Sequence, residues 1–175
     1  KKLTTSVESR MISDVPIGAF LSGGLDSSII VSIMQSISNK PINTFTIGFN
    51  DKGYNEAKSA KEISNFLGTN HTELYITPEK TLDTVSKLPK TWDEPFADSS
   101  QIPTLLLSEL TSKKVKVALS GDGGDELFCG YNRYSQGYSI YKFLRKFPNL
   151  VTKSLSKSLK TINPKYIDKL ISLMP

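Results

Sequence analysis

The sequence predicts an α/β fold in which helices cover both faces of a parallel sheet. Short apolar segments alternate with segments of helical spacing, and repeated strand–helix units of this kind place their strands in parallel. The apolar segments lack a clean polar alternation, which indicates strands that are buried on both faces. Glycine-rich turns follow two of these strands. Because ligands of such sheets bind beyond the carboxyl ends of the strands, we expect the two turns to line one site.

Each element of this fold has its own signal in the sequence. Residues 3–13 predict a short amphipathic helix, and strands are expected at 17–21, 42–49, 71–77 and 115–119. Further helices are expected at 25–37, 55–67, 78–88 and 102–111, with a polar, proline-rich loop at 89–100. Gly68 is suited to end the helix before it and Pro78 to open the helix after it. A helix or turn begins near Asp125.

Composition favours a cytoplasmic protein. The chain has 175 residues, of which 38% are hydrophobic and 22% charged. Its longest apolar stretches, 15–21 and 27–34, are much shorter than the ~20 residues of a membrane span, so no membrane partner is expected. The single cysteine, Cys129, excludes an internal disulfide and fits a reducing compartment. We expect it to be a small packing residue.

The net charge of +5 is concentrated in the tail of the chain. Residues 140–175 carry eight Lys or Arg and one acidic residue, whereas residues 1–139 carry fourteen basic and sixteen acidic residues. A basic tail of this kind is usually a solvated helix face, so we expect no nucleic-acid partner. We expect a motif-bearing domain at 1–139 and a basic helical extension at 140–175, the start of a truncated helical subdomain.

The first glycine-rich turn, Ser22-Gly23-Gly24-Leu25-Asp26-Ser27-Ser28, predicts a phosphate-binding loop. Adjacent glycines let the backbone approach a phosphate closely. The unpaired amides at the start of the following helix attract anions, and the three serine hydroxyls add donors. Asp26 would repel phosphate unless a cation lay between them, so we assign Asp26 to Mg²⁺. The alternative is a plain turn in which the aspartate caps the helix.

Two common nucleotide motifs are absent from the sequence. The spacing Gly-x4-Gly-Lys-Ser/Thr of the Walker A loop does not occur, and neither does the Gly-x-Gly-x-x-Gly of dinucleotide-binding turns.

The second glycine-rich turn spans 120–126 and reads Ser-Gly-Asp-Gly-Gly-Asp-Glu. Three carboxylates in seven residues repel one another, and a shared cation relieves that repulsion. We expect Asp125 to complete the Mg²⁺ site that Asp26 begins. A calcium loop is the rival interpretation, but the Asp-x-Asp-x-Asp-Gly spacing and the distant glutamate are absent.

Four segments together resemble the synthetase domain of the glutamine-hydrolysing asparagine synthetases, in order and spacing, over roughly residues 5–135. They are VPIGAFLSGGLDSS at 15–28, TFTIGF at 44–49, DEPFADSS at 93–100 and SGDGGDELFCGY at 120–131. The first loop alone is also similar to the synthetases of argininosuccinate, GMP, NAD and lysidine. The third and fourth segments narrow the resemblance to asparagine and β-lactam synthetases.

The resemblance implies a Rossmann-like fold of the PP-loop ATP pyrophosphatase class, also called adenine nucleotide α hydrolase-like. It implies that ATP and aspartate give β-aspartyl-AMP and pyrophosphate, and that ammonia then displaces AMP. Adenosine would contact Leu21, Ile47, Gly48, Ser120 and Gly121. The pyrophosphate would be held by Ser22, Gly23, Gly24, Asp26 and Ser27, with Mg²⁺ between Asp26 and Asp125. The nearby Ser28 stays a candidate donor from the interpretation of the loop itself.

Three further expectations follow from the same resemblance. Asp122 stands where many relatives have a glutamate proposed to accept a proton from ammonia, and its side chain is one methylene shorter. Asp98, Ser99 and Ser100 would lie near the aspartate or the adenylate. The family places a glutaminase domain before this one in the same polypeptide, and a homodimer is compatible with the sequence.

Two departures from the family pattern keep other interpretations open. The chain begins Lys1-Lys2-Leu3 rather than with a catalytic cysteine, and the family's synthetase domain continues beyond Pro175 with a lysine for the pyrophosphate. We therefore expect a fragment. The alternatives are an ATP-binding but catalytically incomplete module, a relative that amidates another carboxylate, and a tRNA-modifying relative, which the acidic motif region disfavours.

Overall fold

The structure is a computed structural model that describes residues 1–49, 55–95, 97–148, 151–153 and 156–157. It divides into two compact units, Lys1–Gly124 and Asp125–Pro175. The expected functional division after residue 139 stays a prediction, because a division by packing does not test it. Part of the expected helical tail, at 149–150, 154–155 and 158–175, lies outside the described residues.

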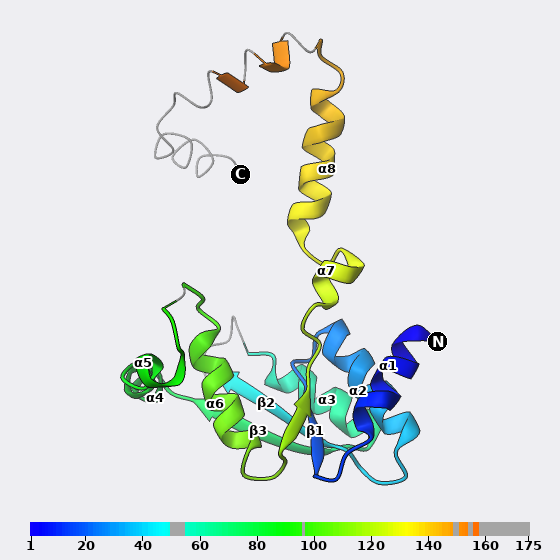
Figure 1. The fold of residues 1–175 in the computed structure, drawn as a ribbon, viewed down its shortest axis with the longest axis vertical. Helices are drawn as coiled ribbons and strands as arrows, with labels where there is room; N and C mark the ends of the chain where they lie inside the picture. The colour runs from blue at the N-terminus through cyan, green and yellow to red at the C-terminus, as the bar shows by residue number, and fades with distance from the viewer. Residues whose placement is uncertain (50–54, 96, 149–150, 154–155, 158–175) are drawn as a thin grey trace. The chain divides into compact units, whose positions relative to one another are not determined.

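The first unit contains a four-stranded parallel sheet in the order β3-β2-β1-β4 (Figure 1). The strands are β1 (Ile17–Phe20), β2 (Asn43–Phe49), β3 (Asn70–Ile76) and β4 (Val117–Leu119). In the central register, Ala19 lies beside Thr44 on one side and Leu119 on the other. Ala19, Thr44 and Phe45 are fully buried, as expected of a sheet covered on both faces.

Helices connect the strands and cover the sheet. They are α1 (Lys2–Met11), α2 (Leu25–Ile37), α3 (Ala57–Leu67), α4 (Pro78–Val85), α5 (Leu88–Thr91) and α6 (Gln101–Thr111). α2 and α3 lead outward from β1 to β3, whereas α4 to α6 return across the sheet to β4. Right-handed crossovers in opposite directions place the two groups on opposite faces, and Figure 1 shows them on separate sides of the sheet.

The strand order creates a topological switch point between β1 and β4. The chain leaves β1 towards β2 and β3, and it later returns to the other side of β1 as β4. The turns after these two neighbouring strands therefore lie side by side at the carboxyl edge of the sheet. This is the position at which open parallel sheets bind ligands, and both glycine-rich turns lie there.

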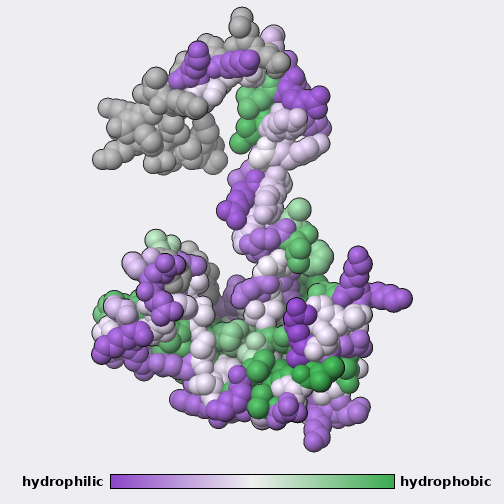
Figure 2. Space-filling view, viewed as in Figure 1, coloured by the Kyte–Doolittle hydropathy of each residue, from purple (hydrophilic) through white to green (hydrophobic). Residues whose placement is uncertain are grey.

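The core of the first unit holds the sheet and helices together. Its largest fully buried side chains are Phe45 of β2, Leu21 after β1, Leu106 of α6, and Met34 and Val31 of α2. Val7 of α1 clusters with Leu21, Val31 and Met34, so the N-terminal helix packs on α2. Hydrophilic residues cover much of the visible surface (Figure 2).

The second unit contains α7 (Gly124–Phe128), which begins at the unit boundary, and α8 (Asn132–Leu144). No described residue of α8 is buried. Tyr134, Tyr138, Ile140, Tyr141 and Phe143 are exposed on this helix. A helix was expected from residue 140, but α8 begins earlier, at Asn132. The basic residues had marked only its later part.

Three local expectations differ from the structure. The loop expected at 89–100 begins as the short helix α5, in which Pro89 occupies a first-turn position that tolerates proline. The fourth strand is limited to β4, although Lys116 N–H still donates to Pro16 O. Cys129 is exposed, with φ of 59°, so its interpretation as a packing residue is wrong.

Candidate functional site

The first glycine-rich loop is a tight link between β1 and α2. Leu21 is buried, and its N–H donates to Phe45 O of the neighbouring strand (2.9 Å). Gly23 follows with φ of 83°, a conformation that favours glycine. A Cβ at Gly23 would also come within 2.8 Å of Ser59 Cβ. The loop therefore needs this glycine both for its turn and for its approach to α3.

Serine hydroxyls stabilise the loop from inside. Ser22 Oγ and Ser27 Oγ lie 3.0 Å apart, and Ser27 Oγ donates to Gly24 O (3.2 Å). Ser28 Oγ donates to the same carbonyl (2.6 Å). Gly24 is the N-cap of α2, and no side chain caps this helix. The first-turn amides thus have no partner within the helix and can serve an anion.

The second glycine-rich loop follows β4. Ser120 Oγ donates to Asp122 Oδ2 (3.0 Å), and Gly124 N–H donates to Gly121 O (3.1 Å), which closes the turn. Gly123 has φ of 84°, and a Cβ added there would meet no atom within 4 Å. Asp122 is exposed at the rim of this turn.

The two loops meet at the start of α2. A Cβ at Gly121 would come within 2.7 Å of Ser27 N and 3.1 Å of Asp26 Cβ. A Cβ at Gly124 would come within 2.7 Å of both carboxylate oxygens of Asp26. Only glycine permits these approaches in the present arrangement. The structure thus places Asp26, the first-turn amides of α2 and the second loop together at the switch point.

The residues expected around adenosine lie on the neighbouring strands of this edge. Leu21 follows β1, Ile47 and Gly48 are near the end of β2, and Ser120 follows β4. Gly48 is buried, and a Cβ there would come within 2.7 Å of the Tyr75 ring and 3.0 Å of Ala57 Cβ. Packing alone therefore accounts for glycine at this position, and its contact with a nucleotide stays a prediction.

Asp125 is the first residue of the second unit and follows Gly124 directly. Its side chain packs on Gly130, whose N–H donates to Asp125 O (3.0 Å). The next carboxylate, Glu126, accepts from the Tyr131 hydroxyl (2.6 Å). This hydrogen bond lowers the pKa of Glu126 below its ordinary value. The pairing of Asp125 with Asp26 stays a prediction.

The loop that holds Asp98, Ser99 and Ser100 precedes α6. Because β3 ends at the carboxyl edge and β4 starts at the opposite edge, the beginning of α6 lies towards the carboxyl edge. Asp98 Oδ1 accepts from Ser100 N–H (2.8 Å), and this bond lowers the pKa of Asp98. All three residues are exposed, so they are accessible from the same edge as the glycine loops.

A pocket of about 490 Å³ adjoins this loop and was not anticipated from the sequence. It is lined by Leu88, Pro89, Trp92, Asp93, Glu94, Pro95 and Gln101. Trp92 is half-buried, whereas Asp93 and Glu94 are exposed. The sequence feature that hints at this pocket is a pair of prolines, Pro89 and Pro95, on either side of an indole and two carboxylates.

The first unit fits a Mg²⁺ ion that is shared with a bound phosphate rather than one enclosed by protein ligands alone. Among the described residues, no group of three or more His, Cys, Asp or Glu side chains could hold a metal ion. Mg²⁺ usually takes one or two carboxylates together with phosphate oxygens and water. Asp26, which forms no ion pair within the described part of the chain, fits such a shared site beside a bound polyphosphate.

His71 lies apart from this site. Its Nδ1 is 2.9 Å from Thr44 Oγ1, which is also 3.0 Å from Thr69 Oγ1. Burial lowers the pKa of His71, as does the positive charge of Lys61, against the opposing effect of Glu73. These contacts give the only histidine of the sequence a structural role.

The fold and the switch-point loops define a parallel α/β protein of the PP-loop class. The sequence model of the family described as Asparagine synthase matches residues 1–171. The chain belongs to the asparagine synthase family. In the part of the chain that the structure describes, no helix is long and apolar enough to cross a membrane.

Individual relatives agree with this assignment. The chain is 42% identical over 140 residues to asparagine synthetase [glutamine-hydrolyzing] 1 of Bacillus subtilis, covering 80% of this chain and 22% of that protein. It is 43% identical over 152 residues to a Methanocaldococcus jannaschii protein that carries a provisional form of the same name, covering 86% and 29%. The chain thus spans less than a third of the length of these relatives.

Solved structures show the same fold at low sequence identity. The NH3-dependent NAD synthetase of Campylobacter jejuni matches with a TM-score of 0.52 and 17% identity, covering 99% of this chain and 86% of that chain. The NMN synthetase of Francisella tularensis matches with a TM-score of 0.52 and 18% identity, covering 74% and 56%. At these identities the comparison concerns the fold alone.

Proposed function

We propose that this chain is the nucleotide-binding part of a ligase that converts aspartate to asparagine with ATP. The observation that carries the proposal is the meeting of the two glycine loops on Asp26 and the start of α2. A site with unpaired helix amides, serine hydroxyls and a free carboxylate suits a polyphosphate with its cation. The family names add the amide-forming reaction.

In the proposed reaction, an aspartate carboxylate oxygen attacks the α-phosphorus of ATP. This forms β-aspartyl-AMP and releases pyrophosphate, and ammonia then displaces AMP to give asparagine. The amides of the first α2 turn and the hydroxyls of Ser22, Ser27 and Ser28 would hold the departing pyrophosphate. The amides are fixed donors, which accelerate a reaction because they need no reorganisation as charge develops. The hydroxyls of Ser27 and Ser28 would first have to turn away from Gly24 O.

Mg²⁺ would be held by Asp26 and Asp125 together with the phosphates, and it would neutralise the charge that develops on them. Adenosine would contact Leu21, Ile47, Gly48, Ser120 and Gly121. We assign proton acceptance from ammonia to Asp122, which is exposed and oriented by the Ser120 hydroxyl. Asp98, Ser99 and Ser100 would contact the acceptor or the adenylate. A glutaminase domain of the same polypeptide would supply the ammonia.

The test measures AMP and pyrophosphate from ATP, aspartate and ammonia, with the chain in its native flanking sequence. We expect the two products in equal amounts, together with asparagine. ATP binding without release of pyrophosphate would instead identify a binding module that lacks catalysis. Release that requires another carboxylate in place of aspartate would identify a relative with a different acceptor.

A further inference from the structure

The pocket between α5 and α6 has the size and the position of a ligand site. Its volume of about 490 Å³ lies within the range of roughly 300–1,000 Å³ usual for small-molecule sites. Its lining runs from α5 to the first residue of α6, which lies towards the edge of the sheet where the glycine loops end. A molecule in this pocket would therefore be on the same edge as the proposed nucleotide site.

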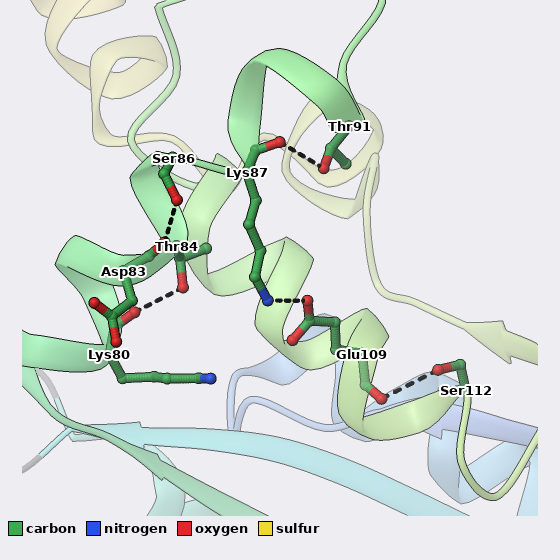
Figure 3. Close-up of polar contacts among 8 residues, drawn as sticks. All are labelled: Lys80, Asp83, Thr84, Ser86, Lys87, Thr91, Glu109 and Ser112. Carbon is green, nitrogen blue, oxygen red and sulfur yellow. Dashed lines mark hydrogen bonds and ion pairs between the residues drawn. The ribbon is translucent and has the colours of Figure 1, made fainter.

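The two walls of the pocket are tied to each other. Lys87, which precedes α5, forms an ion pair with Glu109 of α6 at 2.8 Å (Figure 3). Within the α4–α5 segment, Thr84 Oγ1 donates to Lys80 O (2.7 Å) and Thr91 Oγ1 donates to Lys87 O (3.0 Å). These contacts hold α5 beside α6 without using a side chain of the pocket itself. The ion pair also engages the charge of Lys87, the residue before the lining residue Leu88.

The chemistry of the lining selects for an organic cation. Asp93 and Glu94 supply two carboxylates, and neither forms a hydrogen bond or an ion pair within the described residues. No lysine or arginine lines the pocket. Apart from the Gln101 amide, the other walls are apolar. The aromatic ring of Trp92 is among them, and an ammonium group is stabilised beside such a ring. A hard metal ion would gain nothing from an indole and prolines, and no three-ligand metal group occurs among the described residues.

We propose that this pocket binds the ammonium group of the amino-acid acceptor, through Asp93 and Glu94 with Trp92 beside them. The proposal rests on the proposed function, because it assigns the part of the site that recognises an amino acid rather than a plain dicarboxylic acid. It follows that the protein distinguishes aspartate from succinate, which has the same two carboxylates and no amino group.

The kinetic test compares aspartate with succinate as acceptors, by AMP formation in the chain with its native flanking sequence. In Asp93→Asn and Glu94→Gln we expect the ratio of kcat/KM for aspartate to that for succinate to fall roughly tenfold, the loss typical of one hydrogen bond to a charged group. The KM for ATP stays unchanged. Asp83→Asn, an exposed carboxylate of α4 outside the pocket, is the matched control and keeps the ratio of the wild type.

A binding test needs no turnover, because Trp92 is the only tryptophan of the 175 residues. In the chain itself, aspartate should change the Trp92 emission and succinate should not, and both pocket variants should lose the response. If the wild type uses aspartate but the acceptor ratio or the fluorescence response is unchanged in both variants, the pocket assignment is overturned alone. If the wild type forms no AMP from aspartate and ammonia, the proposed function is overturned with it.

Discussion

Asp26 is the residue on which the account of the site depends most at the residue scale. Its carboxylate lies in the first turn of α2, where the helix dipole favours a negative charge. It also lies against Gly124 of the second loop. A carboxylate can bind a cation only if its charge is not already used in an ion pair. Asp26 forms no ion pair among the described residues.

Replacing Asp26 by Asn removes this charge with little change of shape. We expect Asp26→Asn to reduce pyrophosphate release by at least about a hundredfold, the order found when one electrostatic contact to a reacting group is lost. The unfolding free energy should fall by no more than about 0.3–1 kcal/mol, the contribution of a negative charge at a helix N-terminus. Unchanged turnover would contradict the role of Asp26 in the cation site, and Asp83→Asn serves as the control for a lost surface charge.

Cys129 shows a conformation that its side chain disfavours. It is exposed and has φ of 59°, in the left-handed region where residues with a Cβ are strained. Nothing in the described part of the chain gives its thiol a structural task.

Replacement of Cys129 by Gly should therefore stabilise the second unit. Relief of the left-handed strain, about 1–2 kcal/mol, outweighs the roughly 0.5–1 kcal/mol that the extra freedom of glycine costs in the unfolded chain. Denaturant unfolding of the two proteins measures the difference. A lower unfolding free energy for Cys129→Gly would contradict the assigned strain.

At the scale of elements, the contact between the second loop and α2 rests on Gly121. A methyl group there would come within 2.7 Å of Ser27 N, which is backbone and cannot rotate away. The two loops would have to separate, and with them the groups that we assign to one nucleotide.

We expect Gly121→Ala to weaken ATP·Mg²⁺ binding by roughly tenfold or more, which corresponds to about 1.4 kcal/mol. Calorimetric titration measures the affinity directly. Gly137→Ala is the matched control, because a Cβ at Gly137 meets no atom within 4 Å and alanine is the better helix former. Equal affinities for Gly121→Ala and the wild type would show that the loop contact does not matter for the nucleotide.

The strand β3 carries the only histidine, and its environment predicts a pH dependence of stability. Burial lowers the pKa of folded His71, so the unfolded chain takes up a proton near pH 6.5 before the folded chain does. The unfolding free energy should therefore fall as the pH decreases below about 6.5 and level off below the folded pKa, by at most about 1.4 kcal/mol per pH unit. In His71→Gln this part of the dependence should disappear, which denaturant unfolding at several pH values can check.

Most helices and strands of the first unit could be predicted from the sequence. The strands and helices of the first unit follow from apolar runs, glycines and prolines, and Gly68 ends α3 with φ of 70°, as expected of a C-cap. The sequence shows two prolines around Trp92 and two acidic residues, but only the folded chain shows that these residues line a pocket together with Gln101. The packing of Tyr75 on Gly48 could not be predicted either, since cross-strand register is set by the assembled sheet.

At the scale of the whole molecule, the position of the site follows from topology. The order β3-β2-β1-β4 brings the turns after β1 and β4 together, although about a hundred residues separate them in the chain. The sequence predicted that the two turns line one site, because both follow strands of a parallel sheet. That their strands, β1 and β4, are direct neighbours needed the strand order. The family assignment covers residues 1–171 and agrees with this arrangement.

Hydrogen exchange with and without ATP·Mg²⁺ tests most directly whether the two turns form one nucleotide site. A single bound nucleotide should slow amide exchange in the loop at 22–28 and in the loop at 120–124 at the same ATP concentration, because one ligand would cover both. Protection of only one loop, or half-saturation of the two loops at different ATP concentrations, would contradict a shared site.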